Sequence, residues 1–260
     1  MRSVSDLDGD GAVGLSDVEH LLRHDANIVE QLVEGGDFRS SECVDLLAQA
    51  DIVVTNPPFS LFREYLAQLV EHGKQFLILG QQNAITYKEV FPLLKDGTVW
   101  LGVNNGSDKW FRVPDHYTNT AAGHSKKENG VQYHKLRSIN WFTNMDHSKR
   151  HEELPLGARY NPRDYPHYDN YDAINVDKVA DIPVDWYGAM GVPITFLDSH
   201  NPDQFEVLGI TDRDNNSGLK TKEYSATDVP NPGDLNRRGA ITVDGGLKST
   251  YARLLIRRRR

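Results

Sequence analysis

The segment from residue 51 to residue 80 constrains the fold of this chain more than any other. An apolar run, Asp51-Ile-Val-Val-Thr55, stops at Asn-Pro-Pro-Phe, and apolar residues at helical spacing then run from Ser60 to about His72. A second apolar run, Gln75 to Gly80, follows. Strand, helix and strand in this order indicate a parallel βαβ unit with buried strands, and hence an α/β, doubly wound sheet. Ligands bind such sheets at the carboxyl ends of the strands, where Asn56 lies.

Other elements are expected around this unit. Helices are predicted at Ser16 to Arg23, at Ser41 to Ala50, and at Tyr87 to Lys95 with an internal break at Pro92, and a strand is predicted at Val99 to Val103. Beyond residue 104 the chain is loop-like, with short strand candidates at Ile139 to Thr143, Ile194 to Leu197 and Phe205 to Ile210. Long polar loops on a small scaffold are where recognition usually resides. We therefore expect three parts: a helical segment at 1–35, an α/β core at 36–103, and a β-rich recognition region with the remaining sheet elements at 104–260.

Composition narrows the class of protein. The chain has 260 residues, a single cysteine and a formal net charge of −8. The lone Cys43 excludes an intrachain disulfide and fits a reducing compartment. No run approaches the ~20 apolar residues of a membrane span, and the N-terminus lacks the apolar core of a signal peptide. We expect a cytoplasmic protein with no membrane partner, and the acidic balance argues against a general nucleic-acid coat protein.

Positive charge is nevertheless concentrated in part of the chain. Basic clusters near residues 124–127, 135–137 and 147–151 alternate with aromatic residues, and four arginines end the chain at 257–260. Interleaved cations and aromatic rings can neutralise phosphates and stack bases, and Lys126, Lys127, Lys149 and Arg150 are our candidates for phosphate contacts. The alternative is a solvated surface above ordinary core aromatics, with the arginine tail a floppy end.

The tetrapeptide Asn56-Pro57-Pro58-Phe59 suits methylation of an exocyclic amine. The lone pair of adenine N6 is delocalised into the ring, so the nitrogen becomes nucleophilic only when acceptors hold its N–H groups. Asn56 offers its side-chain oxygen and Pro57 its carbonyl, while two prolines stiffen the loop and bring no competing N–H. Phe59 offers a face on which a flipped base can stack. The alternative is a strand that ends in a proline-rich turn.

Two further patterns lie nearer the N-terminus. In Gly35-Gly-Asp37-Phe38, an acidic residue and an aromatic ring could contact the adenine of a cofactor, although the sequence is also a common turn. The run Asp6-Leu-Asp8-Gly-Asp10-Gly-Ala12-Val-Gly-Leu-Ser-Asp17 has the spacing of an EF-hand-type calcium loop. Its candidate Ca²⁺ ligands are Asp6, Asp8, Asp10, the carbonyl of Ala12, and Asp17 in place of the usual glutamate. An acidic turn that caps a helix is the alternative.

Several longer blocks resemble the EcoRI-type adenine-specific DNA methyltransferases. They are Gly36 to Cys43, Ala50 to Tyr65, Asn83 to Pro92, Trp100 to Gly102, Ile182-Pro183, Met190 to Leu197 and Asn201 to Gly209. The resemblance implies a Rossmann-like sheet and methyl transfer from S-adenosylmethionine to adenine N6 in double-stranded DNA, as in restriction-modification systems with a cognate endonuclease. It places Asn56, Pro57, Pro58 and Phe59 in the catalytic motif, and Asp37 and Phe38 against the adenine of the cofactor.

The sequence departs from this family ahead of residue 36. No glycine-rich strand-to-helix turn precedes it, although such enzymes normally hold the methionine part of the cofactor there. We therefore expect a sheet that is incomplete at its N-terminal side and a chain that lacks an N-terminal cofactor-binding segment. Two alternatives stay open: a catalytically incompetent DNA-binding remnant, and a protein glutamine N-methyltransferase, since a glutamine amide poses the same lone-pair problem.

Overall fold

The computed structural model describes residues 32–33, 35–103, 109–114, 117, 123–212 and 214–260. The chain divides into two compact units, residues 1–49 and 50–260. In the first unit, helix α2 spans Ser41–Gln49, close to the predicted bounds. The Ser40 hydroxyl accepts a hydrogen bond from the N–H of Cys43 at 3.2 Å, which caps the start of the helix. The predicted helix at 16–23 lies outside the described residues.

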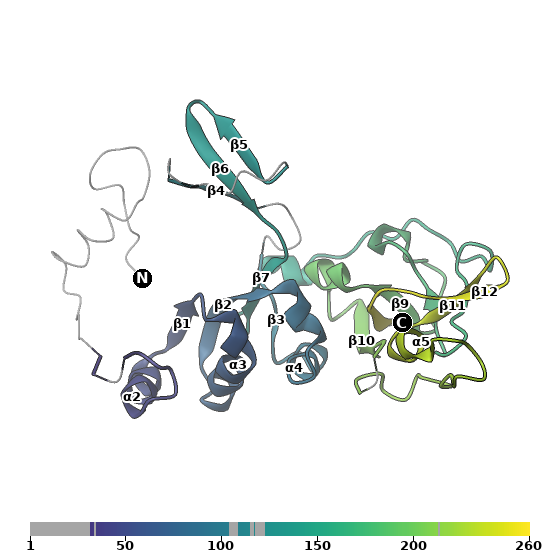
Figure 1. Cartoon of the computed structure of the whole chain (residues 1–260), viewed down its shortest axis with the longest axis horizontal. Helices are drawn as coiled ribbons and strands as arrows, with labels where there is room; N and C mark the ends of the chain where they lie inside the picture. Colours follow the sequence, from purple (N-terminus) through teal and green to yellow (C-terminus); the bar gives the residue numbers. More distant parts are fainter. Residues whose placement is uncertain (1–31, 34, 104–108, 115–116, 118–122, 213) are drawn as a thin grey trace. The chain divides into compact units, whose positions relative to one another are not determined.

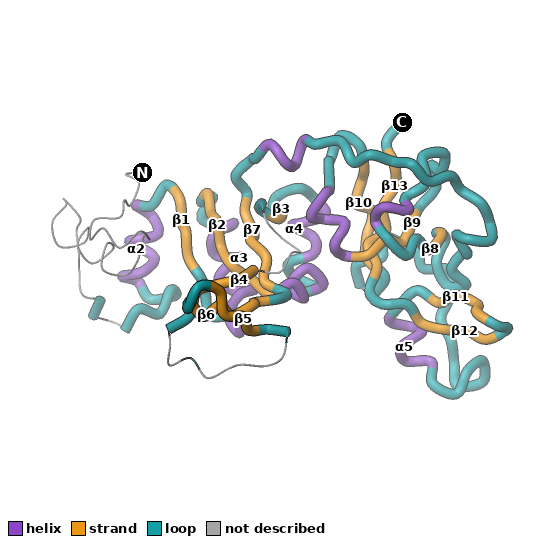
Figure 2. Tube along the Cα trace, turned by 90° about the horizontal axis from the view of Figure 1, so that it is seen from above, coloured by secondary structure: helices purple, strands orange, loops and turns teal. Residues whose placement is uncertain are grey.

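The second unit begins with a four-stranded sheet in the order β1-β2-β7-β3 (Figure 2). Its strands are β1 (Ile52–Thr55), β2 (Gln75–Gln81), β7 (Ile139–Thr143) and β3 (Trp100–Leu101). The predicted parallel pairing of β1 with β2 is confirmed. However, β7 enters between β2 and β3 and is antiparallel to both. The result is a mixed sheet in an α/β fold, and a strand from beyond residue 104 supplies part of it.

The prediction that the first apolar run is buried was wrong. Ile52 and Val54 are 44% and 52% exposed. Strand β1 ends the sheet, and β2 is its one paired neighbour within the described residues. Apolar composition alone does not bury a strand; it needs neighbours on the sheet and a layer over each face.

The connection from β1 to β2 is helical, as predicted. A 3-10 turn, η1 (Phe59–Leu61), leads into α3 (Phe62–Glu71). Phe62 of α3 lies 5.0 Å from Phe142 of β7, ring centroid to centroid. Gly80 of β2 sits under these rings, where an added Cβ would lie 2.5 Å from the Phe62 ring. Glycine is therefore required at this point for the helix to approach the sheet.

The segment after β2 differs from its prediction. Residues Gln82–Thr86 form a 3-10 helix, η2, and the α-helix α4 spans only Phe91–Lys95. Pro92 stands in the first turn of α4 rather than breaking a longer helix. The missing N–H of proline costs nothing in the first turn, because that N–H has no intrahelical partner.

A three-stranded antiparallel sheet in the order β4-β6-β5 precedes β7 (Figure 1). Its strands are β4 (Lys109–Arg112), β5 (Ser125–Glu128) and β6 (Val131–Leu136). Figure 1 shows these strands extending beyond the end of β7. We call this sheet the β-arm.

The rest of the second unit is built on a second sheet in the order β10-β13-β9-β8. Its strands are β8 (Ile174–Asn175), β9 (Met190–Pro193), β10 (Phe205–Ile210) and β13 (Arg253–Arg258). Strand β10 matches its predicted bounds, but Ile194–Ser199 is the 3-10 helix η5 rather than a strand. The alternative of a floppy arginine tail was also wrong for its first residues, since Arg257 and Arg258 belong to β13 and pair with Glu206 and Phe205 of β10.

Smaller elements complete the second unit. They are η3 (Ser148–His151), η4 (Val179–Asp181), α5 (Pro232–Arg237) and the hairpin of β11 (Ala240–Val243) with β12 (Gly246–Ser249). Among the described residues, no helix is long and apolar enough to cross a membrane. The division of the chain into parts at residues 35 and 103 stays a prediction.

Candidate active site and nucleic-acid interface

Asn56 follows the last residue of β1 and therefore lies at the carboxyl end of the sheet. Its side chain is exposed, while Pro57 is buried and Pro58 is exposed. The carbonyl of Pro58 is already used, since it accepts the N–H of Leu61 at 2.9 Å. Within the described part of the chain, no hydrogen bond engages the Asn56 side chain or the Pro57 carbonyl. Two acceptors are thus held, without protein partners, on a backbone that the prolines and η1 make stiff.

Phe59 begins η1, directly after Pro58, and is half-buried. Two oxygen acceptors next to an aromatic surface can hold a planar ring that carries an amino group. The structure therefore brings Asn56, Pro57 and Phe59 together in one short loop, and their chemical roles stay predictions.

A contact joins the start of α3 to the loop after η2. The guanidinium carbon of Arg63 lies 5.6 Å from the centroid of the Tyr87 ring, and the Arg63 guanidinium lies 3.6 Å from the Glu89 carboxylate. These segments follow the carboxyl ends of β1 and β2, which are parallel neighbours. The loop that carries Asn56 and the loop that carries Tyr87 therefore share one edge of the sheet.

A cleft of about 600 Å³ opens beside Tyr87. We call it the η2 cleft; its lining residues are Asn83, Thr86, Tyr87, Pro193, Ile194, Arg238, Tyr251, Ala252 and Arg253. A second hollow of about 250 Å³ shares Thr86, Arg238 and Ala252 with it and adds Lys88 and Arg237. The sequence patterns did not predict this cleft. Its walls come from η2, the junction of β9 with η5, the residue that follows α5, and the β12–β13 connection, and the Arg237-Arg238 pair was the one local signal.

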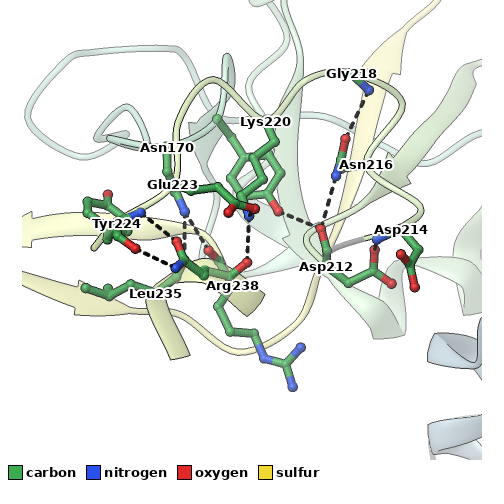
Figure 3. A network of polar contacts seen from close by, with 12 residues as sticks. Asn170, Asp212, Asp214, Asn216, Gly218, Lys220, Glu223, Tyr224, Leu235 and Arg238 are labelled. Atoms are coloured by element: carbon green, nitrogen blue, oxygen red, sulfur yellow. Dashed lines mark hydrogen bonds and ion pairs between the residues drawn. The ribbon is translucent and has the colours of Figure 1, made fainter. Parts of the chain in front are cut away.

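A network of polar contacts anchors the wall of the cleft that carries Arg238 (Figure 3). Nδ2 of the buried Asn170 donates to the carbonyls of Leu235 and Arg238 at 2.8 and 2.9 Å. The Tyr171 hydroxyl donates to the carbonyl of Asp212 at 3.0 Å, which ties down the loop after β10. Backbone segments that carry Arg238 and Asp212 are thus held by side chains from one buried region.

In the first unit, Asp37 and Phe38 are both organised by Arg39. Nε and Nη2 of Arg39 donate to the Asp37 carboxylate at 3.0 and 2.8 Å. These side-chain hydrogen bonds, with one from the Arg39 backbone, lower the pKa of Asp37 to about 2. The guanidinium carbon also lies 5.4 Å from the centroid of the Phe38 ring. Asp37 is therefore ionised near neutral pH, and its side chain is 46% exposed.

The β-arm carries two of the four predicted phosphate contacts. Nζ of Lys126 lies 4.8 Å from the Trp110 ring centroid and 5.6 Å from that of Tyr133, and it pairs with Glu128 at 2.9 Å. Lys127 is exposed. The alternation of cations and aromatics seen in the sequence thus produces cation–π contacts within the arm, with Lys127 facing solvent.

The other two candidates, Lys149 and Arg150, belong to η3. Arg150 lies over the ring of Trp100, with its guanidinium carbon 4.0 Å from the ring centroid, and pairs with Asp146 at 3.5 Å. Lys149 is half-buried near the Asp198 carboxyl, whose pKa burial raises and Lys149 partly lowers. Both residues therefore have intramolecular partners, and a role in phosphate binding stays a prediction.

The calcium-loop residues Asp6, Asp8, Asp10, Ala12 and Asp17 lie outside the described residues. In the part of the chain that is described, no group of three or more histidine, cysteine, aspartate or glutamate side chains is placed to hold a metal ion.

Comparisons with known proteins give the family. A family model described as "Adenine-specific methyltransferase EcoRI" matches residues 1–259. The chain is 52% identical over 186 residues to the Type II methyltransferase M.EcoRI of Escherichia coli, a match that covers 69% of this chain and 57% of that protein. It is 44% identical over 181 residues to the Type II methyltransferase M.MpnI of Mycoplasma pneumoniae, covering 68% of this chain and 57% of that protein.

A third relative is matched over more of its length. The chain is 38% identical over 232 residues to the Type II methyltransferase M.MgeORF184P of Mycoplasma genitalium, covering 88% of this chain and 71% of that protein. No solved structure matches the chain. The chain spans 57% of the length of M.EcoRI and of M.MpnI. The resemblance inferred from the sequence is confirmed: the chain belongs to the EcoRI family of adenine-specific methyltransferases.

Proposed function

We propose that this chain carries the catalytic loop and DNA-binding surfaces of a site-specific DNA methyltransferase that modifies adenine N6 with S-adenosylmethionine as methyl donor. One observation carries the proposal. In a member of this family, the Asn56 side chain and the Pro57 carbonyl stand at the carboxyl end of β1 without hydrogen-bond partners among the described residues. Polar groups left open in this way at a strand end are available to a ligand.

The chemistry of the amine explains why two acceptors are needed. As N6 attacks, its lone pair leaves conjugation with the ring and positive charge develops on the amino group. Hydrogen bonds from its two N–H groups to the Asn56 oxygen and the Pro57 carbonyl stabilise that charge more than they stabilise the planar amine. Stacking on Phe59 fixes the plane of the ring. One N6 proton then leaves to water, so no strongly basic side chain is required.

S-adenosylmethionine, when bound, supplies a methyl group on a positively charged sulfur. The residues that would hold its adenine are Asp37 and Phe38. Arg39 takes three of the roughly four acceptor positions of the Asp37 carboxylate, two with its guanidinium and one with its backbone N–H, so one position remains for an adenine amine. The half-buried Phe38 ring offers a surface for stacking. These residues fit the adenine part of the cofactor.

Duplex DNA is the proposed substrate, with Lys126, Lys127, Lys149 and Arg150 as candidate phosphate contacts. The exposed Lys127 on the β-arm is the best placed of the four, because the others already contact aromatic rings or carboxyl groups. A cognate restriction endonuclease stays a prediction from the family resemblance.

The proposal is tested by transfer of radiolabelled methyl from S-adenosylmethionine to unmethylated duplex DNA, followed by digestion to nucleosides. The chain is assayed alone and joined to the part of M.EcoRI that lies outside the match. We expect label in N6-methyladenosine, loss of that label in Asn56→Ala, and retention in Asn231→Ala, a matched control at an exposed asparagine before α5. Label in protein rather than DNA, or in neither, would contradict the proposal.

A further inference from the structure

The η2 cleft contains an aromatic side chain whose exposure nothing else in the fold explains. Tyr251 is 86% exposed and lies in the short connection between β12 and β13. Large aromatic side chains normally bury most of their surface, and those left in solvent often serve recognition. The neighbouring Tyr87, on the opposite wall, is half-buried.

The backbone beneath Tyr251 is firmly held on both sides. The N–H and hydroxyl of Thr250 donate to the Gly239 carbonyl at 2.8 and 3.0 Å. The N–H of Arg253 donates to the Thr211 hydroxyl at 2.9 Å. The exposed ring is thus mounted on a fixed segment, so a ligand that stacks on it need not order the backbone.

Two guanidinium groups, that of Arg238 in the η2 cleft and that of Arg237 in the adjoining hollow, have no carboxylate partner among the described residues. Arg237 is exposed, and the Arg238 guanidinium donates a weak hydrogen bond, 3.4 Å long, to the Arg237 carbonyl. Figure 3 shows the Arg238 guanidinium directed away from the polar network that holds its backbone. The acidic groups nearby are engaged. Asp212 accepts two backbone N–H groups at 2.9 and 2.7 Å, and Asp214 lies 3.9 Å from Lys88.

We propose that the η2 cleft and the adjoining hollow bind a DNA strand next to the target adenine, with a base stacked on Tyr251 and backbone phosphates bound by Arg238 and Arg237. This inference rests on the proposed function and extends it to residues outside the Asn-Pro-Pro-Phe loop. The η2 cleft has a volume of about 600 Å³, within the roughly 300–1,000 Å³ typical of ligand sites. An aromatic platform beside unpaired cations is the arrangement that tracks a nucleic-acid strand.

The position of the cleft favours this occupant. Its near wall, η2 and Tyr87, follows the carboxyl end of β2, and Asn56 follows the carboxyl end of the adjacent parallel strand. The contact between Arg63 and Tyr87 links the two loops directly. A strand whose adenine reaches Asn56 therefore passes the edge of the sheet on which the cleft opens.

Affinity and salt dependence separate the two kinds of contact. The probe is a fluorescein-labelled mixed-sequence DNA duplex, and binding is followed by anisotropy over a series of salt concentrations. Tyr251→Ala is expected to weaken binding roughly 5- to 150-fold with an unchanged salt slope, because base stacking involves no counterion release. Tyr251→Phe keeps the ring and should bind like the native chain. The plot of log K against log salt has a negative slope. Arg237→Ala and Arg238→Ala should each make that slope shallower, reducing its magnitude by about 0.9.

Matched controls and a cross-link complete the test. Arg159→Ala removes an arginine that is 81% exposed, lies outside the cleft and pairs loosely with Asp185 at 3.7 Å, so binding should be unchanged. An iododeoxyuridine-substituted duplex should photo-cross-link to Tyr251. Native binding by Tyr251→Ala and both arginine variants would overturn the cleft assignment. If that result were found and methylation still depended on Asn56, the proposed function would stand without the cleft assignment. A native chain that binds no DNA would overturn the cleft assignment and remove support for a DNA substrate.

Discussion

Strands β1 and β13 show how far burial depends on neighbours rather than on composition. The run Ile52–Thr55 contains three aliphatic residues, yet two of them are about half exposed because β1 ends its sheet. The run Arg253–Arg258 begins and ends with arginine, yet its three central residues are fully buried between β10 and β9. Aliphatic residues are therefore half exposed in a strand at a sheet edge and fully buried in a strand at a sheet centre, even where arginines flank them.

The comparison predicts unequal costs for truncation at the two strands. Leu254→Ala in β13 should lower the free energy of unfolding by about 2–5 kcal/mol, because it leaves a cavity in a closed core. Val54→Ala in β1 should cost about 0.5 kcal/mol or less, because half of that side chain already meets solvent. Urea denaturation of both variants measures the difference. Equal losses would show that β1 is covered in solution.

A second test concerns what covers the inner strands of the first sheet. Gly80→Ala would place a methyl group 2.5 Å from the Phe62 ring and 2.8 Å from the Phe142 ring, both fully buried. We expect a loss of about 1–3 kcal/mol from overpacking. Gly157→Ala is the matched control, since a Cβ there meets no atom within 4 Å. A neutral Gly80→Ala would mean that α3 packs less closely on β2 than described.

A third test uses pH at the region where the second sheet meets η5. His200 packs on Phe196 with ring centroids 5.5 Å apart, and its Nε2 lies 3.2 Å from the Phe205 carbonyl. Desolvation by burial, with smaller effects of Arg150 and Arg259, lowers the pKa of His200 below its ordinary 6.5. The unfolded chain therefore takes up the proton first, and stability falls as pH drops below 6.5, by at most about 1.4 kcal/mol per pH unit. Comparison of native and His200→Gln unfolding at pH 7 and pH 5 measures this loss. An equal drop in both proteins would assign it to other groups.

The smallest expected effect is in the β-arm. Lys126→Ala removes cation–π contacts to Trp110 and Tyr133 at a partly exposed site, and we expect a loss of about 0.5–1 kcal/mol. Lys127→Ala should leave stability unchanged and weaken DNA binding instead, because that side chain faces solvent. Thermal melting and anisotropy together separate the two. Weakened binding without destabilisation in Lys126→Ala would mean that the lysine serves DNA rather than the arm.

What the sequence could predict follows from the range of the interactions involved. Strands β7 and β10 match their predicted bounds, and the Asn-Pro-Pro-Phe loop lies at a strand end as expected, because local patterns determine such features. The η2 cleft could not be predicted, since Tyr87, Arg238 and Tyr251 meet only through the tertiary fold. The segment 194–197 was mistaken for a strand because short apolar runs do not distinguish a strand from a 3-10 turn.

The most direct test of the central claim is the rate of a single methyl transfer by Asn56→Ala, measured beside its DNA affinity. If the Asn56 oxygen stabilises the charge that develops on N6, the rate should fall by about 100-fold or more while affinity changes little. A rate near the native value, or a loss no larger than the loss of DNA binding, would contradict the account.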